Sequence, residues 1–484
     1  MKFSTLSLLS LATAAAAIDI NVDDQASIKA AASDVAKKLR ALYPTGESWF
    51  VAGEFGKLPP PPSGKDIGYY WWEGGAAMGA WIDYWAITGD DTYNDIVTTA
   101  MLSNVGPEND YQPPRVFASL GNDDQAFWGI AAMSAAERGF PDPPKDKPQW
   151  LALAQAVFNR QASRWDTEHC GGGLRWQVMQ ANNGYNYKNS ISNGLFFQIG
   201  ARLARYTGNT TYVEWAEKVW DWTKHSGLLT SDFKIYDGFS IQDCVVSGQG
   251  KIMWSYNAGT YLAGAAYMYD YYTLTGNPAN ASDWKNITQS LLQATDEPFF
   301  NRNDGLPNIM RESGCESQPP NFSNAATCNT DQRSFKAYLS RFFAYTYQLC
   351  PFTRDFIMTR LRASAVAAAK SCTGSPGGDT CGLSWLMQKY DGSTYGIAQG
   401  GVGEHLAAME LFQNLLIQQV KTPNTQQTGT SKGNPSAGSG DSALTAADLR
   451  QTGPTTAGDR AGASILTIVC ICLLGAFTWF LVVD

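Results

Sequence analysis

Two adjacent aspartates, Asp123 and Asp124, are the residues in this sequence best suited to chemistry. Neighbouring positions can bring two carboxyls about 5 Å apart, which is the separation found in retaining glycosidases. An inverting glycosidase needs roughly 6.5–9.5 Å to admit a water molecule. In the retaining mechanism one carboxylate is the nucleophile and the other, in its neutral form, is the acid, so repulsion and burial must raise one pKa.

The same stretch also has the features of an ordinary helix start. Asn122 is a good N-cap, Gln125 falls at the third helical position as in a capping box, and apolar residues follow. The helix dipole favours aspartates in a first turn. The pattern alone therefore fits a helix cap at least as well as a catalytic pair.

Other kinds of chemistry have little support. The three histidines, His169, His225 and His405, stand far apart, which argues against a histidine metal site or a Ser-His-Asp triad. The glycine motifs of nucleotide-binding loops are missing from the sequence. The net charge of −8, without a basic cluster, argues against nucleic acid as a partner. We expect no metal and no cofactor.

Several motifs resemble those of a known family. The stretch Leu120-Gly-Asn-Asp-Asp-Gln-Ala-Phe-Trp128 resembles the paired-aspartate motif of glycoside hydrolase family 76, the endo-α-1,6-mannanases. Further motifs that match are Tyr70-Trp-Trp-Glu-Gly-Gly, Asp83-Tyr-Trp-Ala-Ile-Thr-Gly-Asp-Asp91, Gly171-Gly-Gly-Leu-Arg-Trp176, Tyr187-Lys-Asn-Ser-Ile-Ser-Asn-Gly194 and Trp254-Ser-Tyr-Asn-Ala-Gly259. The resemblance covers about residues 20–420 and is strongest to the lipid-anchored fungal wall members of the family.

The resemblance implies an all-α (α/α)6 toroid of helical hairpins with a cleft at one face. It also implies an enzyme that cleaves α-1,6-mannosidic bonds by double displacement. Asp123 matches the nucleophile and Asp124 the general acid/base. Residues in the matching motifs that would line the cleft and bind substrate are Trp72, Glu73, Trp128, Lys188, Asn189, Tyr256 and Asn257. For the wall members it also implies transglycosylation, in which the mannose core of a GPI glycan is cut and passed to wall β-glucan. The sequence leaves open whether water or a sugar is the acceptor.

Two other functions stay open at this point. A non-catalytic mannan-binding wall protein on the same toroid would keep aromatic platforms and lose the paired carboxylates. An inverting glycosidase would need a second carboxylate on another hairpin, such as Asp237 or Glu73. Loss of function in Asp123→Asn with binding retained would exclude the first, and the stereochemistry of the first product would exclude the second.

Helical periodicity recurs along the chain and predicts the elements that must position these residues. It begins at Ile28–Leu42 and continues at about 72–88, 91–103, 123–138, 148–164, 190–206, 211–225, 255–275, 283–295, 331–349, 353–371 and 399–420. Three of these helices end in Thr-Gly followed by Asp or Asn, at Gly89, Gly208 and Gly276. Glycine suits the left-handed end of a helix, and Asp or Asn caps the next one. Hairpins joined this tightly indicate a solenoid or a closed toroid, in one domain over residues 18–420.

Both ends of the chain resemble processing signals. Residues 1–17 read as a secretory signal peptide. The polar segment 421–463 is expected to be a disordered stalk with a GPI attachment region, and 464–484 a hydrophobic signal tail that is removed. We therefore expect a monomer held by a lipid anchor on the outer face of the plasma membrane, and in the cell wall.

Cysteines and glycosylation sites agree with secretion. Cys315 with Cys328 and Cys372 with Cys381 each bracket a loop rich in turn residues, so two local disulfides are expected. Cys170, Cys244 and Cys350 remain, and their pairing is open. Asparagines in N-glycosylation sequons are Asn209, Asn280, Asn286 and Asn321.

Overall fold

The structure, a computed structural model, describes residues 18–48, 50–56, 69–300, 305–316, 327–374, 378–392, 401–439 and 457–483. The expected signal peptide, the sequon at Asn321 and residues 440–456 of the expected stalk lie outside these ranges. Within the ranges, no helix is both long enough and apolar enough to cross a membrane.

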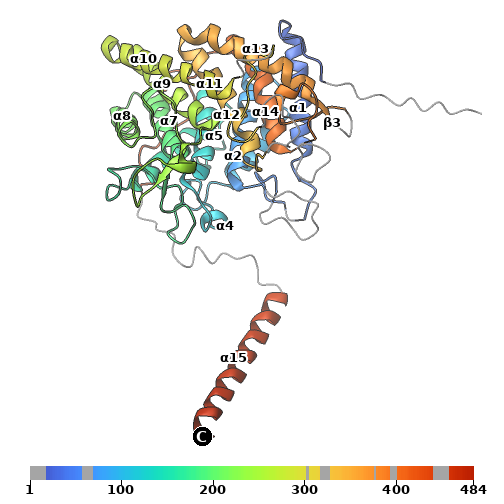
Figure 1. Ribbon diagram of the computed structural model, residues 1–484, viewed down its shortest axis with the longest axis vertical. Coiled ribbons are helices and arrows are strands. Elements are labelled where there is room, and N and C mark those ends of the chain that lie inside the picture. Colours follow the sequence, from blue (N-terminus) through green and yellow to red (C-terminus); the bar gives the residue numbers. More distant parts are fainter. Residues whose placement is uncertain are drawn as a thin grey trace, which may run out of the picture.

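Six helices form a closed inner ring (Figure 1). Each packs against the next in the order of the chain, and the last returns to the first. They are α2 (Trp71–Thr88), α5 (Asn122–Arg138), α7 (Ser190–Thr207), α9 (Ser255–Leu274), α12 (Phe335–Leu349) and α14 (Val402–Asn414). These helices are buried on almost every side, which requires small or apolar residues all around the helix.

A second set of six helices surrounds the ring, and each packs against an inner helix. They are α1 (Gln25–Ala41), α3 (Asn94–Ser103), α6 (Trp150–Ser163), α8 (Thr210–His225), α10 (Pro278–Ala294) and α13 (Arg354–Ser371). The expected (α/α)6 toroid of helical hairpins is thereby confirmed, and each of the twelve ranges with helical periodicity overlaps one of these helices.

The remaining elements are short, apart from the C-terminal helix. Strands β1 (Tyr187–Asn189) and β2 (Gly238–Ser240) pair antiparallel, as do β3 (Cys372–Gly374) and β4 (Thr380–Cys381). The others are α4 (Pro114–Phe117), η1 (Gly248–Lys251), α11 (Asp296–Phe299), η2 (Gln332–Ser334), η3 (Pro351–Thr353), η4 (Trp385–Met387), η5 (Ile417–Gln419) and α15 (Ala457–Val483).

The Thr-Gly joins have the geometry that their sequence predicts. Gly89, Gly208 and Gly276 have φ angles of 81°, 73° and 72°, which a residue with a side chain rarely adopts. Asn209 and Asn277 cap α8 and α10, because their side chains accept backbone N–H groups of the first turn. These tight joins let each outer helix return along its inner helix.

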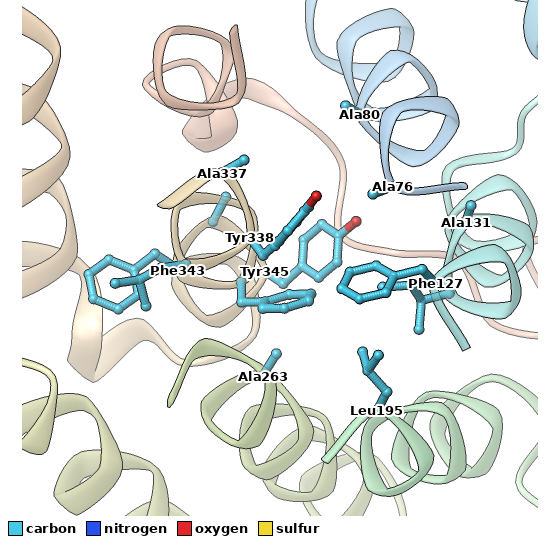
Figure 2. Close-up of a cluster of buried hydrophobic side chains, with 14 of the residues drawn as sticks. Ala76, Ala80, Phe127, Ala131, Leu195, Ala263, Ala337, Tyr338, Phe343 and Tyr345 are labelled. Atoms are coloured by element: carbon cyan, nitrogen blue, oxygen red, sulfur yellow. The ribbon is translucent and has the colours of Figure 1, made fainter. Parts of the chain in front are cut away.

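The middle of the ring is filled with side chains, so the toroid has a solid core. Figure 2 shows residues of α2, α5, α7, α9 and α12 meeting there, among them Phe127, Leu195 and Tyr345. Buried ion pairs tie the inner helices together below them: Arg138 Nε lies 2.9 Å from Asp83 Oδ1, and Arg202 Nη2 lies 2.6 Å from Glu137 Oε2. Removal of one partner of such a pair would leave a buried charge unpaired, which is costly.

Residues 421–439, named here the C-terminal strap, contradict the expected disordered stalk. The backbone N–H of Asn424 donates to the carbonyl of Glu137 (2.8 Å), and that of Gln426 donates to the carbonyl of Tyr206 (2.7 Å). Farther along, the Ser431 hydroxyl accepts the backbone N–H of Leu151 (3.0 Å). The folded part of the chain therefore extends at least to residue 439, because polar groups of the toroid satisfy the backbone of the strap.

The expected disulfides Cys315–Cys328 and Cys372–Cys381 are confirmed, and Cys170 pairs with Cys244, a pairing that the sequence left open. Cys350 is free and buried.

Candidate active site

The six inner helices begin at the same end of the toroid. Each of the first five is followed by an outer helix that returns the chain to the same end, so all six run in one direction. Four aspartates lie at this end, which we name the carboxylate face: Asp123, Asp124, Asp237 and Asp331. The positive ends of six helix dipoles therefore converge on a group of acidic side chains.

Asp123 and Asp124 lie in the first turn of α5, which begins one residue earlier than the sequence suggested, so the two aspartates lie one position later in the helix. The N-cap is Gly121, and Asp124 is the third helical residue, whose Oδ2 accepts the backbone N–H of Gly121 (2.7 Å). Asn122 does not cap the helix, because its side chain donates to the carbonyl of Arg175 (2.8 Å). The start of α5 is thus held by the segment around residues 175–178.

Gly121 also sets the spacing of the pair. A Cβ atom built on Gly121 would lie 2.3 Å from Asp123 Oδ1 and 3.1 Å from Asp124 Oδ2. Since one point lies this close to both oxygens, they are no more than about 5.4 Å apart. This limit fits the separation in retaining glycosidases and is shorter than an inverting enzyme needs.

Burial and mutual repulsion perturb both carboxyls. Desolvation, followed by the charge of Asp124, raises the pKa of Asp123 well above its ordinary value; backbone N–H groups and a hydrogen bond from Trp176 oppose this shift. Desolvation raises the pKa of Asp124 to about 7, the Gly121 N–H opposes the rise, and the charge of Asp331 adds to it. The two groups cannot both ionise easily, so the pair holds a proton near neutral pH.

Asp331 is a site residue that sequence reasoning missed. It precedes η2, at the start of α12, and its Oδ1 accepts the indole N–H of Trp72 (3.2 Å). Trp72 in turn packs on Phe127, one turn after Asp124, with 4.6 Å between ring centroids. Burial raises the pKa of Asp331 to about 6. Trp72 therefore lies beside the carboxylate face, and its partner there is a carboxylate that no local motif marks.

Asp237, Tyr256 and Asn257 form the opposite side of the carboxylate face. Asp237 Oδ2 accepts the hydroxyl of Tyr187 (2.9 Å), and its Oδ1 accepts the amide of Asn257 (3.2 Å). Tyr256 stacks on Phe335, with 3.7 Å between centroids, and its hydroxyl is close enough to Asp237, Asp123 and Asp331 to be affected by their charges. Asn257 is fully buried, so it positions Asp237.

Trp176 is a second residue that the sequence did not single out. It is 36% exposed, and its backbone carbonyl accepts the N–H of Asn122 (2.8 Å), next to the pair. Its indole lies close enough to the carboxyl of Asp123 to lower the pKa of that group. An exposed indole beside a catalytic-type carboxyl is suited to stacking on a sugar ring. The Gly-Gly-Gly-Leu-Arg-Trp motif was the signal for it.

Four predicted substrate-binding residues have other places in the structure. Trp128 is fully buried and stacks between Trp71 and Tyr111, so it belongs to the core. Asn189 caps α7 by accepting the N–H of Ser192 (3.2 Å). The predictions that these two side chains contact substrate are corrected by their burial.

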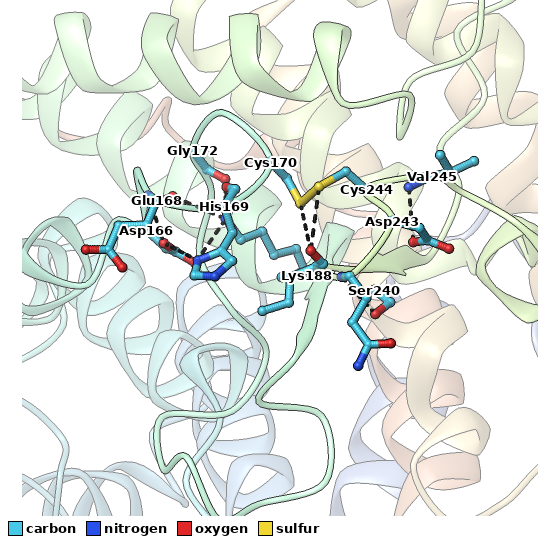
Figure 3. The surroundings of a disulfide bond; sticks show 12 residues. Asp166, Glu168, His169, Cys170, Gly172, Lys188, Ser240, Asp243, Cys244 and Val245 are labelled. Atoms are coloured by element: carbon cyan, nitrogen blue, oxygen red, sulfur yellow. Dashed lines mark hydrogen bonds and ion pairs between the residues drawn. A yellow bond between two sulfur atoms is a disulfide. The ribbon is translucent and has the colours of Figure 1, made fainter.

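Lys188 is the third of these residues, and it secures a loop. Its ammonium group is fully buried and donates to the carbonyls of His169 (2.7 Å) and Gly172 (2.6 Å), beside the Cys170–Cys244 disulfide (Figure 3). These bonds fold residues 166–173 under the strand β1, which leads into α7.

Glu73 is the fourth, and it lies behind the carboxylate face. It is fully buried, and neither carboxyl oxygen has a hydrogen-bond partner among the described residues. Burial and the charges of Asp331 and Glu404 raise its pKa well above the ordinary value, because both disfavour a charge on Glu73. It does not reach the surface as a substrate ligand or as the base of an inverting mechanism.

An α/α toroid that presents an adjacent carboxyl pair at one end defines a glycosidase of the helical-toroid class. Comparison with known proteins gives the family: residues 27–427 match glycosyl hydrolase family 76. The chain therefore belongs to glycosyl hydrolase family 76.

Individual relatives agree with this assignment. Mannan endo-1,6-alpha-mannosidase DCW1 of Candida glabrata is 44% identical over 471 residues, covering 96% of this chain and 95% of the relative. The crystal structure of Dfg5 from Chaetomium thermophilum, solved with glucosamine, has a TM-score of 0.77 at 42% identity and covers 86% of this chain and 97% of that one. An inactive variant of the α-1,6-mannanase of Salegentibacter, solved with α-1,6-mannotriose, shares the fold (TM-score 0.58, 16% identity, covering 80% and 99%).

Proposed function

We propose that this glycosidase cleaves α-1,6-mannosidic bonds with retention of configuration, with Asp123 as nucleophile and Asp124 as acid and base. The observation that supports the proposal most is the close spacing of the pair beside Gly121, where one oxygen of each carboxyl lies within about 5.4 Å of the other, as in a retaining glycosidase. We infer the substrate from the relatives, which are named mannan endo-1,6-alpha-mannosidases. The similarity extends over nearly the full length of both chains.

The contacts of the pair assign a task to each oxygen. Asp124 Oδ2 is held by the Gly121 N–H, so Oδ1 carries the proton that passes to the leaving sugar oxygen. Asp123 Oδ1 is buried without a hydrogen-bond partner among the described residues, so Oδ2 attacks the anomeric carbon. The positive charge that develops on the sugar favours the anion of Asp123, so the proton of the pair is on Asp124 until it passes to the leaving oxygen.

The second step decides between hydrolysis and transfer. Asp124, now a carboxylate, takes a proton from a water molecule or a sugar hydroxyl, whose oxygen then displaces Asp123 from the anomeric carbon. We propose that a hydroxyl of wall β-glucan is the physiological acceptor and that the donor is α-1,6-mannan or a GPI core glycan. The enzyme acts as a monomer at the outer face of the plasma membrane, held by a GPI anchor that replaces its apolar tail, and in the cell wall.

The test is the configuration of the first product from an α-1,6-mannotetraose. Proton NMR should show the α-anomer before mutarotation, and a labelled β-glucan oligosaccharide should receive mannose in competition with water. A first product of β configuration would refute retention. Binding of the tetraose without any cleavage would instead favour the non-catalytic protein.

Asp331 offers a separate test of the role of Asp124. We expect Asp331→Asn to move the alkaline limb of kcat/KM to lower pH by about 0.5–1 unit, because the carboxylate of Asp331 raises the pKa of Asp124. Without that charge, Asp124 loses its proton at lower pH. Below about pH 6 Asp331 is itself protonated, so the variant should match the wild type there.

The pH profile of kcat/KM checks this expectation, with the exposed Asp95→Asn as control. In Asp331→Asn, the side-chain amide oxygen can still accept the Trp72 N–H, so that hydrogen bond is retained. An alkaline limb that stays in place or moves upward would contradict the assignment of Asp124 as the acid.

A further inference from the structure

A groove of about 620 Å³ lies between the C-terminal strap and the toroid. On the toroid side it is lined by Thr207 and Asn209 of the join between α7 and α8 and by residues of α6 and α8. Its volume is that of a site for a small ligand, and most of the side chains that line it are polar. The four aspartates of the carboxylate face are not among the described residues of its lining, so the groove is separate from the proposed active site.

The strap side of the groove is fixed in place by buried groups of the toroid. Gln155 is buried, and its Oε1 accepts the backbone N–H of Asn434 (2.6 Å). A Cβ atom at Gly433 would lie 2.7 Å from this same oxygen, and one at Gly429 would lie 2.2 Å from the hydroxyl of Tyr206. Glycine at these positions lets the strap lie directly on the helices. The groove is therefore a built part of the fold.

Asn209 is the lining residue that identifies an occupant. It is exposed and begins the sequon Asn209-Thr210-Thr211. Its Oδ1 accepts the backbone N–H of Thr211 (3.0 Å) and so caps α8. Its Nδ2, the atom to which an N-glycan is joined, has no hydrogen-bond partner among the described residues. The helix cap and a glycan can therefore coexist on this one side chain.

We propose that Asn209 carries an N-glycan whose inner sugars fill the groove and hold the strap against the toroid. Three disulfides indicate that the chain folds in an oxidising compartment of the secretory pathway, where such glycans are added. In that reaction Asn209 Nδ2 attacks the anomeric carbon of a lipid-linked oligosaccharide pyrophosphate. The new N–C bond replaces the C–O bond, the pyrophosphate leaves with the electron pair, and the nitrogen releases one proton.

The order of the chain favours this arrangement. Asn209 precedes the strap, so the glycan is in place before the strap is synthesised and folds over it. On the strap side, the exposed side chains of Gln426, Thr430 and Lys432 line the groove. Amide, hydroxyl and ammonium groups all form hydrogen bonds with the hydroxyls of an uncharged sugar. Both walls of the groove thus suit a glycan that starts from one of them.

The first test asks whether the strap shields the glycan. The full-length protein is secreted from a eukaryotic host and treated in its folded state with endoglycosidase H, which cuts within the glycan core. A variant with residues 424–439 replaced by Gly and Ser at equal length is treated in parallel, and mass spectrometry of the glycopeptides follows each site. We expect the Asn209 glycan to be released about 10-fold faster from the variant, because its strap no longer covers the groove.

Thermal unfolding shows whether the toroid of this variant is intact. A glycan on Asn286, which is exposed on α10, should be released at the same rate from both proteins. The absence of a glycan from Asn209, or equal rates of its release from both proteins, would overturn the proposal.

The second test asks whether the glycan holds the strap, and it needs no change in the strap. Thr211→Ala removes the sequon and leaves the cap, since Asn209 accepts a backbone N–H of residue 211. Thr211→Ser retains the sequon and is the matched control at the same exposed position. Limited digestion with trypsin is followed at Lys432, which is exposed on the strap.

We expect cleavage after Lys432 to be about 10-fold faster in Thr211→Ala, because cleavage follows the population of detached strap and the glycan supplies hydrogen bonds that oppose detachment. Coupling between two sites is reciprocal, so both tests must show the effect. Equal cleavage of the two variants would overturn the proposal. Protection of Thr211→Ala by added α-1,6-mannotetraose would assign the groove to a free glycan, which would also overturn it.

Discussion

Replacement of Asp123 by asparagine is expected to lower the rate of cleavage by about 10⁴-fold or more, because an amide does not form the glycosyl-enzyme ester. Asp124→Asn should lower it by about 10²–10⁴-fold with a natural leaving group, which needs the proton. Both residues are partly exposed at the carboxylate face, so the folded structure should persist.

An activated substrate separates the two roles. A mannosyl fluoride needs no proton to leave, so it should restore formation of the glycosyl-enzyme in Asp124→Asn and have no such effect in Asp123→Asn. Single-turnover release of fluoride measures this step, and the Asp95→Asn variant controls for the loss of a carboxylate elsewhere. The reverse pattern would exchange the roles, and full activity of both variants would reduce the pair to a helix cap.

A single methyl group at Gly121 is expected to lower kcat/KM by about 100-fold. The backbone of Gly121, with φ −91° and ψ 155°, is one that alanine adopts freely, so the fold has no need of glycine there. The added Cβ would overlap Asp123 Oδ1 and crowd Asp124 Oδ2, and displacement of a catalytic group by about 1 Å can cost about 100-fold in rate.

Steady-state kinetics of Gly121→Ala, with thermal unfolding measured in parallel, check this prediction. Gly200→Ala in α7 is the control, because the nearest atom to its added Cβ is 3.4 Å away. Loss of activity with an unchanged unfolding temperature is the expected result. Normal activity would show that the carboxyls tolerate displacement and that the spacing across Gly121 does not carry the mechanism.

The helices could be predicted from the sequence because their signals are local. Apolar spacing and the Thr-Gly joins depend on residues within one or two turns, and tertiary packing did not override them. The N-cap of α5 was misplaced by one residue, since the side chain of Asn122 bonds to Arg175 across the fold. Local pattern carries no information about such a partner.

Whether a side chain belongs to the site depends on how deeply it is buried in the toroid, and a sequence motif does not show this. Trp72 and Trp128 occupy similar aromatic motifs, yet Trp72 reaches Asp331 and Trp128 is enclosed by Trp71 and Tyr111. Asp331 had no signal because its partner is distant in the sequence. The strap was predicted to be disordered from its polar composition, and side chains of α6 and α7 supply the hydrogen bonds that order it.

Acidic side chains with raised pKa values, at and behind the carboxylate face, link folding to proton uptake. Glu73 has a raised pKa, and burial raises the pKa values of Asp331, Asp124 and Glu312 to about 6, 7 and 8, above ordinary values of 3.8 and 4.5. Near neutral pH the unfolded chain has released protons that the folded chain still binds, so the free energy of unfolding falls as pH rises between about 4 and 8. Acidification of the surroundings would therefore strengthen the fold while it keeps Asp124 protonated for its work.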